Sequence, residues 1–148
     1  MRKSLGKARL KYPLTGARID QDASGTTRFV LDNVPEFQVR VLDKKNDSEW
    51  LDLAWDEQKK PFDLNRGPLI KFLLLSSADT SDLVVICHHC ICDGLSLAYL
   101  IRDIALFLSE PDVEVEALPL LPGVSVENLS GEVVPSWLER TVINRMNR

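Results

Sequence analysis

Hydrophobic positions along the chain change period several times, and each change predicts a new element. Apolar residues three and four apart are typical of a helix with one buried face, whereas strict alternation is typical of a half-buried strand. In chain order the pattern predicts a helix ending near Tyr12, a β-hairpin over 17–31, a strand over 37–42, a helix over 46–60, strands over 69–76 and 83–88, and a helix over 94–108. This mixture indicates helices packed on a sheet.

The apolar faces of these elements predict how they pack. The face of helix 46–60 that we expect to lie on the sheet consists of Trp50, Leu51, Ala54 and Trp55. The corresponding face of helix 94–108 consists of Leu97, Ile101, Ile104, Ala105 and Leu108. Strands 69–76 and 83–88 are almost continuously apolar, so we expect them at the centre of the sheet, covered on both faces.

Two connecting segments differ from these elements in composition. Residues 61–68 are rich in turn formers but contain Phe62 and Leu64, which predicts an ordered loop with both side chains against the core. Residues 109–135 contain four prolines and no clear period, which predicts a long crossover loop. This loop would follow a lobe formed by residues 1–108. After the loop we expect a terminal amphipathic helix over 136–148.

Composition narrows the classes of protein that fit. A chain of 148 residues with 45% hydrophobic content suits one globular core. Its net charge of −4 argues against a nucleic-acid partner, which would need a basic face. The longest apolar runs fall far short of the ~20 residues of a transmembrane segment. The start of the chain lacks the apolar stretch of a secretory signal, so we expect a cytoplasmic location and three reduced cysteines.

The chemically interesting residues gather in one run, Cys87-His88-His89-Cys90-Ile91-Cys92-Asp93-Gly94, which holds both histidines and all three cysteines. A zinc site would need ligands from two separated pairs, so we expect no metal here. A nucleophilic dyad of Cys87 and His89 is also disfavoured, because side chains two apart on a strand run parallel. We expect the cysteines to be small packing residues.

A third interpretation is a general base at the junction of a strand and a helix. Alternation sends His88 and His89 to opposite faces, and we expect His88 to be structural. The positive end of the following helix favours a neutral imidazole at His89, which could accept a proton from an attacking hydroxyl, amine or thiol. Asp93 could cap the helix or pair with an arginine, and Gly94 allows a close approach of backbone or substrate.

The run His88 to Gly94 matches the His-His-x-x-x-Asp-Gly signature, and the sequence thereby resembles the condensation-domain and chloramphenicol-acetyltransferase-like acyltransferases. Further features of the resemblance lie over residues 5–108, among them Tyr12-Pro13-Leu14, Arg18-Ile19, Pro61-Phe62-Asp63-Leu64 and Gly67-Pro68-Leu69. The Tyr-Pro-Leu start looks more like the alcohol or polyketide-associated acyltransferases than like peptide-synthetase condensation domains.

The resemblance implies an α+β fold, one lobe of an α/β two-layer sandwich with a mixed, largely antiparallel sheet and helices on one face. It implies transfer of an acyl group from a coenzyme A or carrier-protein thioester to a hydroxyl or amine, or peptide-bond-forming condensation, with His89 as general base and no tightly bound cofactor. Asp93 would be structural and paired with an arginine. Arg18 is the best candidate, with Arg28 and Arg40 as alternatives, and Gly94 would keep a substrate tunnel open.

The resemblance also implies a second lobe, which we do not recognise in these residues, and no Asp-Phe-Gly-Trp-Gly-like segment occurs. We therefore expect an N-terminal lobe with the C-terminal lobe absent and with little transferase activity by itself. Apolar surface left uncovered would favour a homodimer. An alternative from another class is a non-catalytic remnant or interaction module of the same fold.

Overall fold

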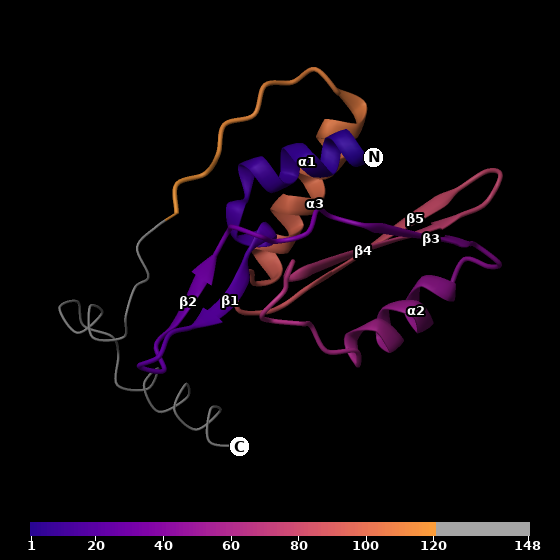
Figure 1. The fold of residues 1–148 in the computed structure, drawn as a ribbon. Coiled ribbons are helices and arrows are strands. Elements are labelled where there is room, and N and C mark those ends of the chain that lie inside the picture. Colours follow the sequence, from indigo (N-terminus) through magenta and orange to yellow (C-terminus); the bar gives the residue numbers. More distant parts are fainter. Residues whose placement is uncertain (121–148) are drawn as a thin grey trace, which may run out of the picture. The chain divides into compact units, whose positions relative to one another are not determined.

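The computed structural model describes residues 1–120 of the chain (Figure 1). Its elements are, in order, α1 (Arg2–Lys11), the short 3-10 helix η1 (Pro13–Gly16), β1 (Arg18–Gln21), β2 (Thr27–Val30), β3 (Val39–Asp43), α2 (Glu49–Gln58), β4 (Ile70–Ser76), β5 (Ser81–Cys87) and α3 (Gly94–Ser109). Every element predicted within these residues is present. The expected loop over 109–135 is described only to residue 120, without helix or strand, and the helix expected over 136–148 lies outside the described residues.

Two sheets make up the β-structure of residues 1–120. Strands β1 and β2 form an antiparallel hairpin, with Arg18 opposite Val30. The second sheet has the order β3-β4-β5, in which β4 pairs in parallel with β3 and antiparallel with β5. The mixed α+β class is thereby confirmed. Of the two strands expected at the centre, only β4 has a neighbour on each side within the described residues, and β5 forms an edge there.

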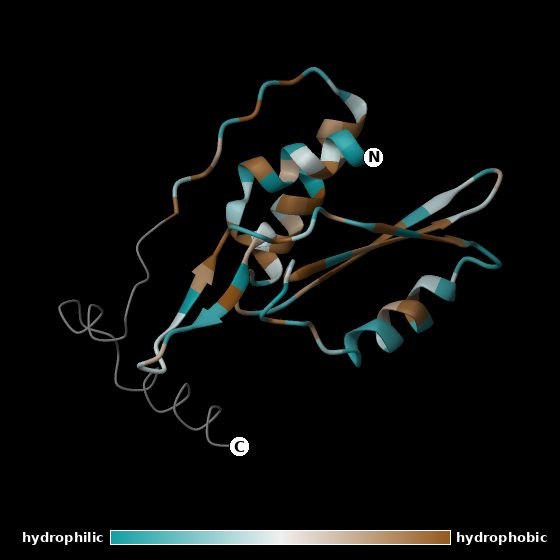
Figure 2. Ribbon diagram, in the orientation of Figure 1, coloured by the Kyte–Doolittle hydropathy of each residue, from teal (hydrophilic) through white to brown (hydrophobic). Residues whose placement is uncertain are grey.

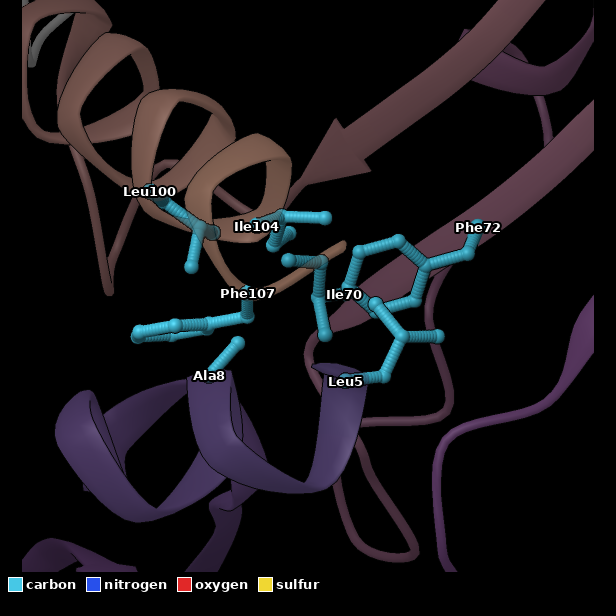
Figure 3. Close-up of a cluster of buried hydrophobic side chains, with 7 residues drawn as sticks. All are labelled: Leu5, Ala8, Ile70, Phe72, Leu100, Ile104 and Phe107. Atoms are coloured by element: carbon cyan, nitrogen blue, oxygen red, sulfur yellow. The ribbon is translucent and has the colours of Figure 1, made fainter. Parts of the chain in front are cut away.

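The hydrophobic core lies between α1, α3 and one face of the sheet (Figure 3). Leu5 from α1, Phe72 from β4, and Ile104 and Phe107 from α3 are at most 2% exposed. Burial of each such side chain contributes about 1.5–3 kcal/mol relative to exposure. Figure 2 shows hydrophobic residues along the strands of this sheet and on α3, whereas α1 and α2 mix polar and apolar residues.

Helix α2 lies against the opposite face of the same sheet (Figure 1). Lys71, Leu73 and Leu75 alternate with the core residues of β4, and Lys71 Nζ donates to the carbonyl of Lys60, just after α2, at 2.9 Å. The expectation of helices on one face therefore holds for α1 and α3 but not for α2. The reason is that β4 is apolar on both faces, so each face needs a cover.

The side of α2 that faces the sheet differs from the predicted one. Trp50, Leu51 and Trp55 are 42%, 53% and 65% exposed. The buried position is Glu57, whose carboxylate accepts hydrogen bonds from Arg40 and Lys60, each at 2.6 Å. The helix therefore turns Glu57 inward, where it forms two ion pairs, and its tryptophans outward.

Helix α3 has its predicted bounds but buries a neighbouring face. Leu100, Ile104 and Phe107 are buried, whereas Ile101 and Leu108 are 41% and 42% exposed. The helix is apolar around most of its circumference, so its period did not determine which side meets the sheet. In the loop before β4, Phe62 is half-buried and Leu64 is exposed.

A buried polar cluster joins α1 to α3. The side chain of Asp103 is 1% exposed, and its carboxylate contacts Tyr12 Oη at 2.6 Å, Lys11 Nζ at 2.6 Å and Arg102 Nη2 at 2.8 Å. Burial alone would raise the pKa of Asp103, but these three donors outweigh it and hold the pKa at about 2. Burial and the bond to Asp103 raise the pKa of Tyr12 to about 12. The cluster fixes the position of α3 against α1.

Candidate functional site

The cysteine and histidine run forms a strand, a turn and a helix start. The ladder of the sheet extends to His88, whose backbone N–H donates to Leu69 O at 2.9 Å. A tight turn follows, in which Ile91 N–H donates to His88 O at 3.1 Å. Gly94 then begins α3, whose first turn is closed by Leu97 N–H donating to Asp93 O at 2.9 Å. The N-terminus of α3 therefore lies directly after the histidine turn.

His89 is exposed, and its ring is held by a single backbone contact. Its Nδ1 lies 3.1 Å from Cys92 O. Because a carbonyl oxygen can only accept, this contact requires a hydrogen on Nδ1. In the neutral imidazole the lone pair is then on Nε2, which is the nitrogen available to accept a proton from a substrate. The turn thus presents the basic nitrogen outward.

His88 has the opposite arrangement. Its Nδ1 accepts the backbone N–H of Cys90 at 3.2 Å and lies 2.9 Å from Cys90 Sγ. A nitrogen that accepts an N–H carries no hydrogen, so the neutral ring is protonated on Nε2. The His88 ring also meets the ring of Phe62 edge to face, with centroids 5.6 Å apart and an interplanar angle of 83°. Two adjacent histidines therefore have opposite tautomers when neutral.

The three cysteines occupy different environments, and all are free thiols. Cys87 is half-buried against the core, as expected of a packing residue. Burial, and to a lesser extent the contact with Cys92, raises the pKa of its thiol. A thiol held protonated is a poor nucleophile, which argues against the Cys87–His89 dyad. Cys90 is exposed, contrary to expectation, because the turn directs it to His88 instead of the core.

Metal-binding side chains do not converge in the described part of the chain. Among residues 1–120, no group of three or more histidine, cysteine, aspartate or glutamate side chains is placed to hold a metal ion. None of the described helices has the length and apolar content needed to cross a bilayer.

Asp93 caps α3. Its carboxylate accepts the backbone N–H of Ser96 at 2.8 Å, and this bond lowers the pKa of Asp93. An N-cap of this kind typically stabilises a helix by about 1 kcal/mol. Of the two roles that the sequence left open for Asp93, the structure shows the cap.

The arginine expected to pair with Asp93 is bound elsewhere. Arg18 contacts Asp32 at 3.1 Å and Asp20 at 3.7 Å. The two alternatives also have other partners, since Arg28 lies 3.4 Å from Asp20 and Arg40 lies 2.6 Å from Glu57. Arg18 and Arg28 are on the β1–β2 hairpin, where the acidic partners are near in sequence and cost little chain entropy to reach. The predicted pairing of Arg18 with Asp93 is therefore not formed.

Gly94 occupies the first position of α3 without steric need. A Cβ built on this residue meets no atom within 4 Å, and its backbone does not adopt a positive φ. The fold of the described residues would accept a side chain here. Open space at Gly94 lies beside the histidine turn, as a passage for substrate would require.

Sequence reasoning missed one neighbour of the site. Phe62 was expected against the core, but its contact is the His88 ring. The sequence did indicate that Phe62 has a packing partner, because it is a large apolar residue in a turn-rich loop. Nothing local identifies that partner, because 26 positions separate the two residues in the chain.

The sequence of the chain is similar to those of known proteins. The sequence model described as "Condensation domain" matches residues 1–114. The phosphinothricin tripeptide synthetase PhsC of Streptomyces viridochromogenes is 27% identical over 158 aligned residues, which cover 95% of this chain and 14% of that protein. The finer placement beside the alcohol or polyketide-associated enzymes finds no support in this relative.

Solved structures share the fold. The first condensation domain of the calcium-dependent antibiotic synthetase, in complex with a substrate analogue, aligns with a TM-score of 0.62 at 18% identity, over 88% of this chain and 33% of that one. Polyketide synthase associated protein 5 from Mycobacterium tuberculosis aligns with a TM-score of 0.62 at 14% identity, over 94% and 32%. The chain therefore spans about a third of each structure.

Proposed function

Because the chain belongs to the condensation-domain family, we propose that it contributes the catalytic histidine to an acyl-transfer reaction. The donor is an acyl thioester on a carrier-protein phosphopantetheine arm or on coenzyme A, and the acceptor is a small amine or hydroxyl. The observation that carries this proposal is the His89 ring, whose Nδ1 is engaged by Cys92 O while its Nε2 remains open.

In the proposed step, the acceptor amine attacks the thioester carbonyl as His89 Nε2 takes one of its protons. The tetrahedral intermediate collapses by breaking the carbon–sulfur bond, and the protonated imidazole returns the proton to the departing thiolate. The products are an amide, or an ester for a hydroxyl acceptor, and a free thiol. No group on the protein forms a covalent acyl intermediate, and the reaction needs no tightly bound cofactor.

The remaining motif residues support this step through position. The N-cap by Asp93 fixes the start of α3, and His88 anchors the turn that carries His89. The direct test measures acyl transfer in the natural polypeptide that contains these residues, using acyl thioesters of a carrier protein and of coenzyme A as donors. If neither donor reacts with any amine or hydroxyl acceptor, the proposal fails and the non-catalytic module becomes the better explanation.

Replacement of Gly94 by alanine is expected to separate stability from activity. Because a Cβ at this position meets nothing, Gly94→Ala should leave the free energy of unfolding unchanged or raise it by up to about 1 kcal/mol, from reduced chain entropy. If the open space is a substrate passage, the larger Gly94→Leu should retain stability and lower acyl transfer. Chemical denaturation and the transfer assay measure the two effects. Full activity of Gly94→Leu would contradict a passage at this point.

Exposed apolar side chains lead us to propose self-association. Trp50, Leu51 and Trp55 on α2 are 42%, 53% and 65% exposed. Large apolar patches favour contact between molecules. Sedimentation velocity should show a concentration-dependent dimer that Trp55→Gln with Leu51→Gln weakens, whereas the exposed Leu10→Gln on α1 serves as control. A single monomeric species at high concentration would be evidence against this interface.

A further inference from the structure

Phe62 stands between a strand of the sheet and the histidine turn. It belongs to the loop that joins α2 to β4, and its half-buried ring meets the His88 ring edge to face, with centroids 5.6 Å apart. Edge-to-face contact is a favoured geometry for aromatic pairs, because the positive edge of one ring meets the negative face of the other. The contact therefore selects an orientation of the imidazole as well as its position.

The Phe62 ring is itself in contact with the ammonium group of Lys71. Lys71 Nζ on β4 lies 4.5 Å from the centroid of the Phe62 ring. The same ammonium group donates to Lys60 O at 2.9 Å, so it is tied to the chain just after α2. An ammonium over a ring is attracted by the negative face of the aromatic system. Lys71, Phe62 and His88 thus form a continuous row from the sheet to the turn.

His88 transmits this support to the backbone that carries His89. Its ring Nδ1 accepts the N–H of Cys90, one residue beyond His89, and its carbonyl accepts the N–H of Ile91. The two backbone N–H groups that follow His89 are therefore both bonded to His88. If the His88 ring rotated, the Cys90 N–H would lose its acceptor, and the His89 ring would lose the backbone that directs it.

We propose that Phe62 is a positioning residue, which holds the His88 imidazole in its Nδ1-acceptor orientation and thereby fixes the turn that presents His89. The role requires an aromatic ring, since an aliphatic side chain of similar volume has neither the face that attracts Lys71 nor the quadrupole that orients His88. The inference deepens the proposed function and rests on it for its catalytic consequence. Its structural part stands on the contacts of Phe62 with Lys71 and His88 and on the bond of His88 to Cys90.

The chain offers a direct readout because it contains only two histidines. With ¹⁵N-labelled histidine, at a pH where both rings are neutral, NMR should show His88 protonated on Nε2 and His89 protonated on Nδ1. In Phe62→Leu we expect the ¹⁵N shifts of His88 to move toward those of a mixture of tautomers, whereas Phe62→Tyr should preserve the original shifts. Phe29→Leu, at an exposed position of the hairpin, is the matched control.

Lys71→Met provides a second perturbation that leaves the phenyl ring in place. It should move the His88 shifts in the same direction as Phe62→Leu but by less, and it keeps the test decisive if Phe62→Leu does not fold. In acyl transfer, Phe62→Leu should lower kcat by roughly tenfold with little change in KM, because the base is displaced while substrate binding persists. Phe62→Tyr should restore kcat.

Unchanged His88 shifts in a folded Phe62→Leu protein would overturn the inference, as would loss of the His88 tautomer equally in Phe29→Leu. Failure of the proposed function gives a different result. In that case the natural polypeptide that contains these residues transfers no acyl group, while the dependence of the His88 shifts on Phe62 persists.

Discussion

Replacement of His89 by alanine is expected to lower kcat for acyl transfer by about 10²- to 10⁴-fold, the range typical of a lost general base. The Nε2 lone pair is the group removed, and no other described side chain of the turn offers an unengaged basic nitrogen, since the Nδ1 of His88 already accepts an N–H. The assay compares donor thioester consumption and product formation in the natural polypeptide containing these residues.

Stability should not change with this substitution. His89 is exposed, so loss of its ring removes little buried surface. Gln58→Ala, at an exposed position at the end of α2, is a control that should retain both activity and stability. Wild-type turnover by folded His89→Ala protein would exclude this residue as the base, and a stability loss large enough to unfold the protein would show that its role is structural.

Replacement of Asp103 by alanine is expected to have the largest effect on stability, a loss of about 2–3 kcal/mol. The substitution leaves the half-buried Tyr12 hydroxyl without its acceptor and removes the partner of Lys11. Both cations can regain water, because the Lys11 and Arg102 side chains are 27% and 63% exposed, which limits the cost. Asp112→Ala, in the exposed loop after α3, is the control.

The Asp103 carboxylate also makes the free energy of unfolding depend on pH. The pKa of Asp103 is about 2 in the folded state against 3.8 for an ordinary aspartate, so its contribution is complete above about pH 5 and is lost as pH falls through about 2. This lowering of the Asp103 pKa corresponds to about 2 kcal/mol in the free energy of unfolding. Denaturant titrations of the wild type and Asp103→Ala over this range should converge at low pH. A gap between the two proteins that is constant with pH would contradict the ion-pair explanation.

The bounds of the elements near the site were predictable because they depend on neighbours in sequence. Helix α3 begins at Gly94 as expected, since an aspartate before an apolar period is a local capping signal. Its buried face was predicted only in part: Leu97 and Ile104 lie against or in the core, but Ile101 and Leu108 are exposed although they are as apolar as the residues that form the core. Packing against α1 and the sheet added Leu100 and Phe107, which the period had not assigned to the buried face.

The partners of charged residues show the same limit. Arg18 was expected at Asp93, yet it contacts two acidic residues of the hairpin region. Asp103 gave no signal in the sequence, where an aspartate in an apolar helix would be expected to face solvent. Its burial depends on Tyr12 and Lys11, which are more than 90 positions away in the chain. Ion pairing is decided by which side chains the fold brings together.

By itself, the sequence determined that two histidines and an aspartate lie on a strand, a turn and a helix start, because spacing along the chain controls these local conformations. It also matches the condensation-domain family over residues 1–114. The tertiary structure decided which nitrogen of each imidazole is engaged by the backbone and that the Phe62 ring meets His88. Those outcomes depend on hydrogen-bond directions and on contacts between distant segments, which no local pattern encodes.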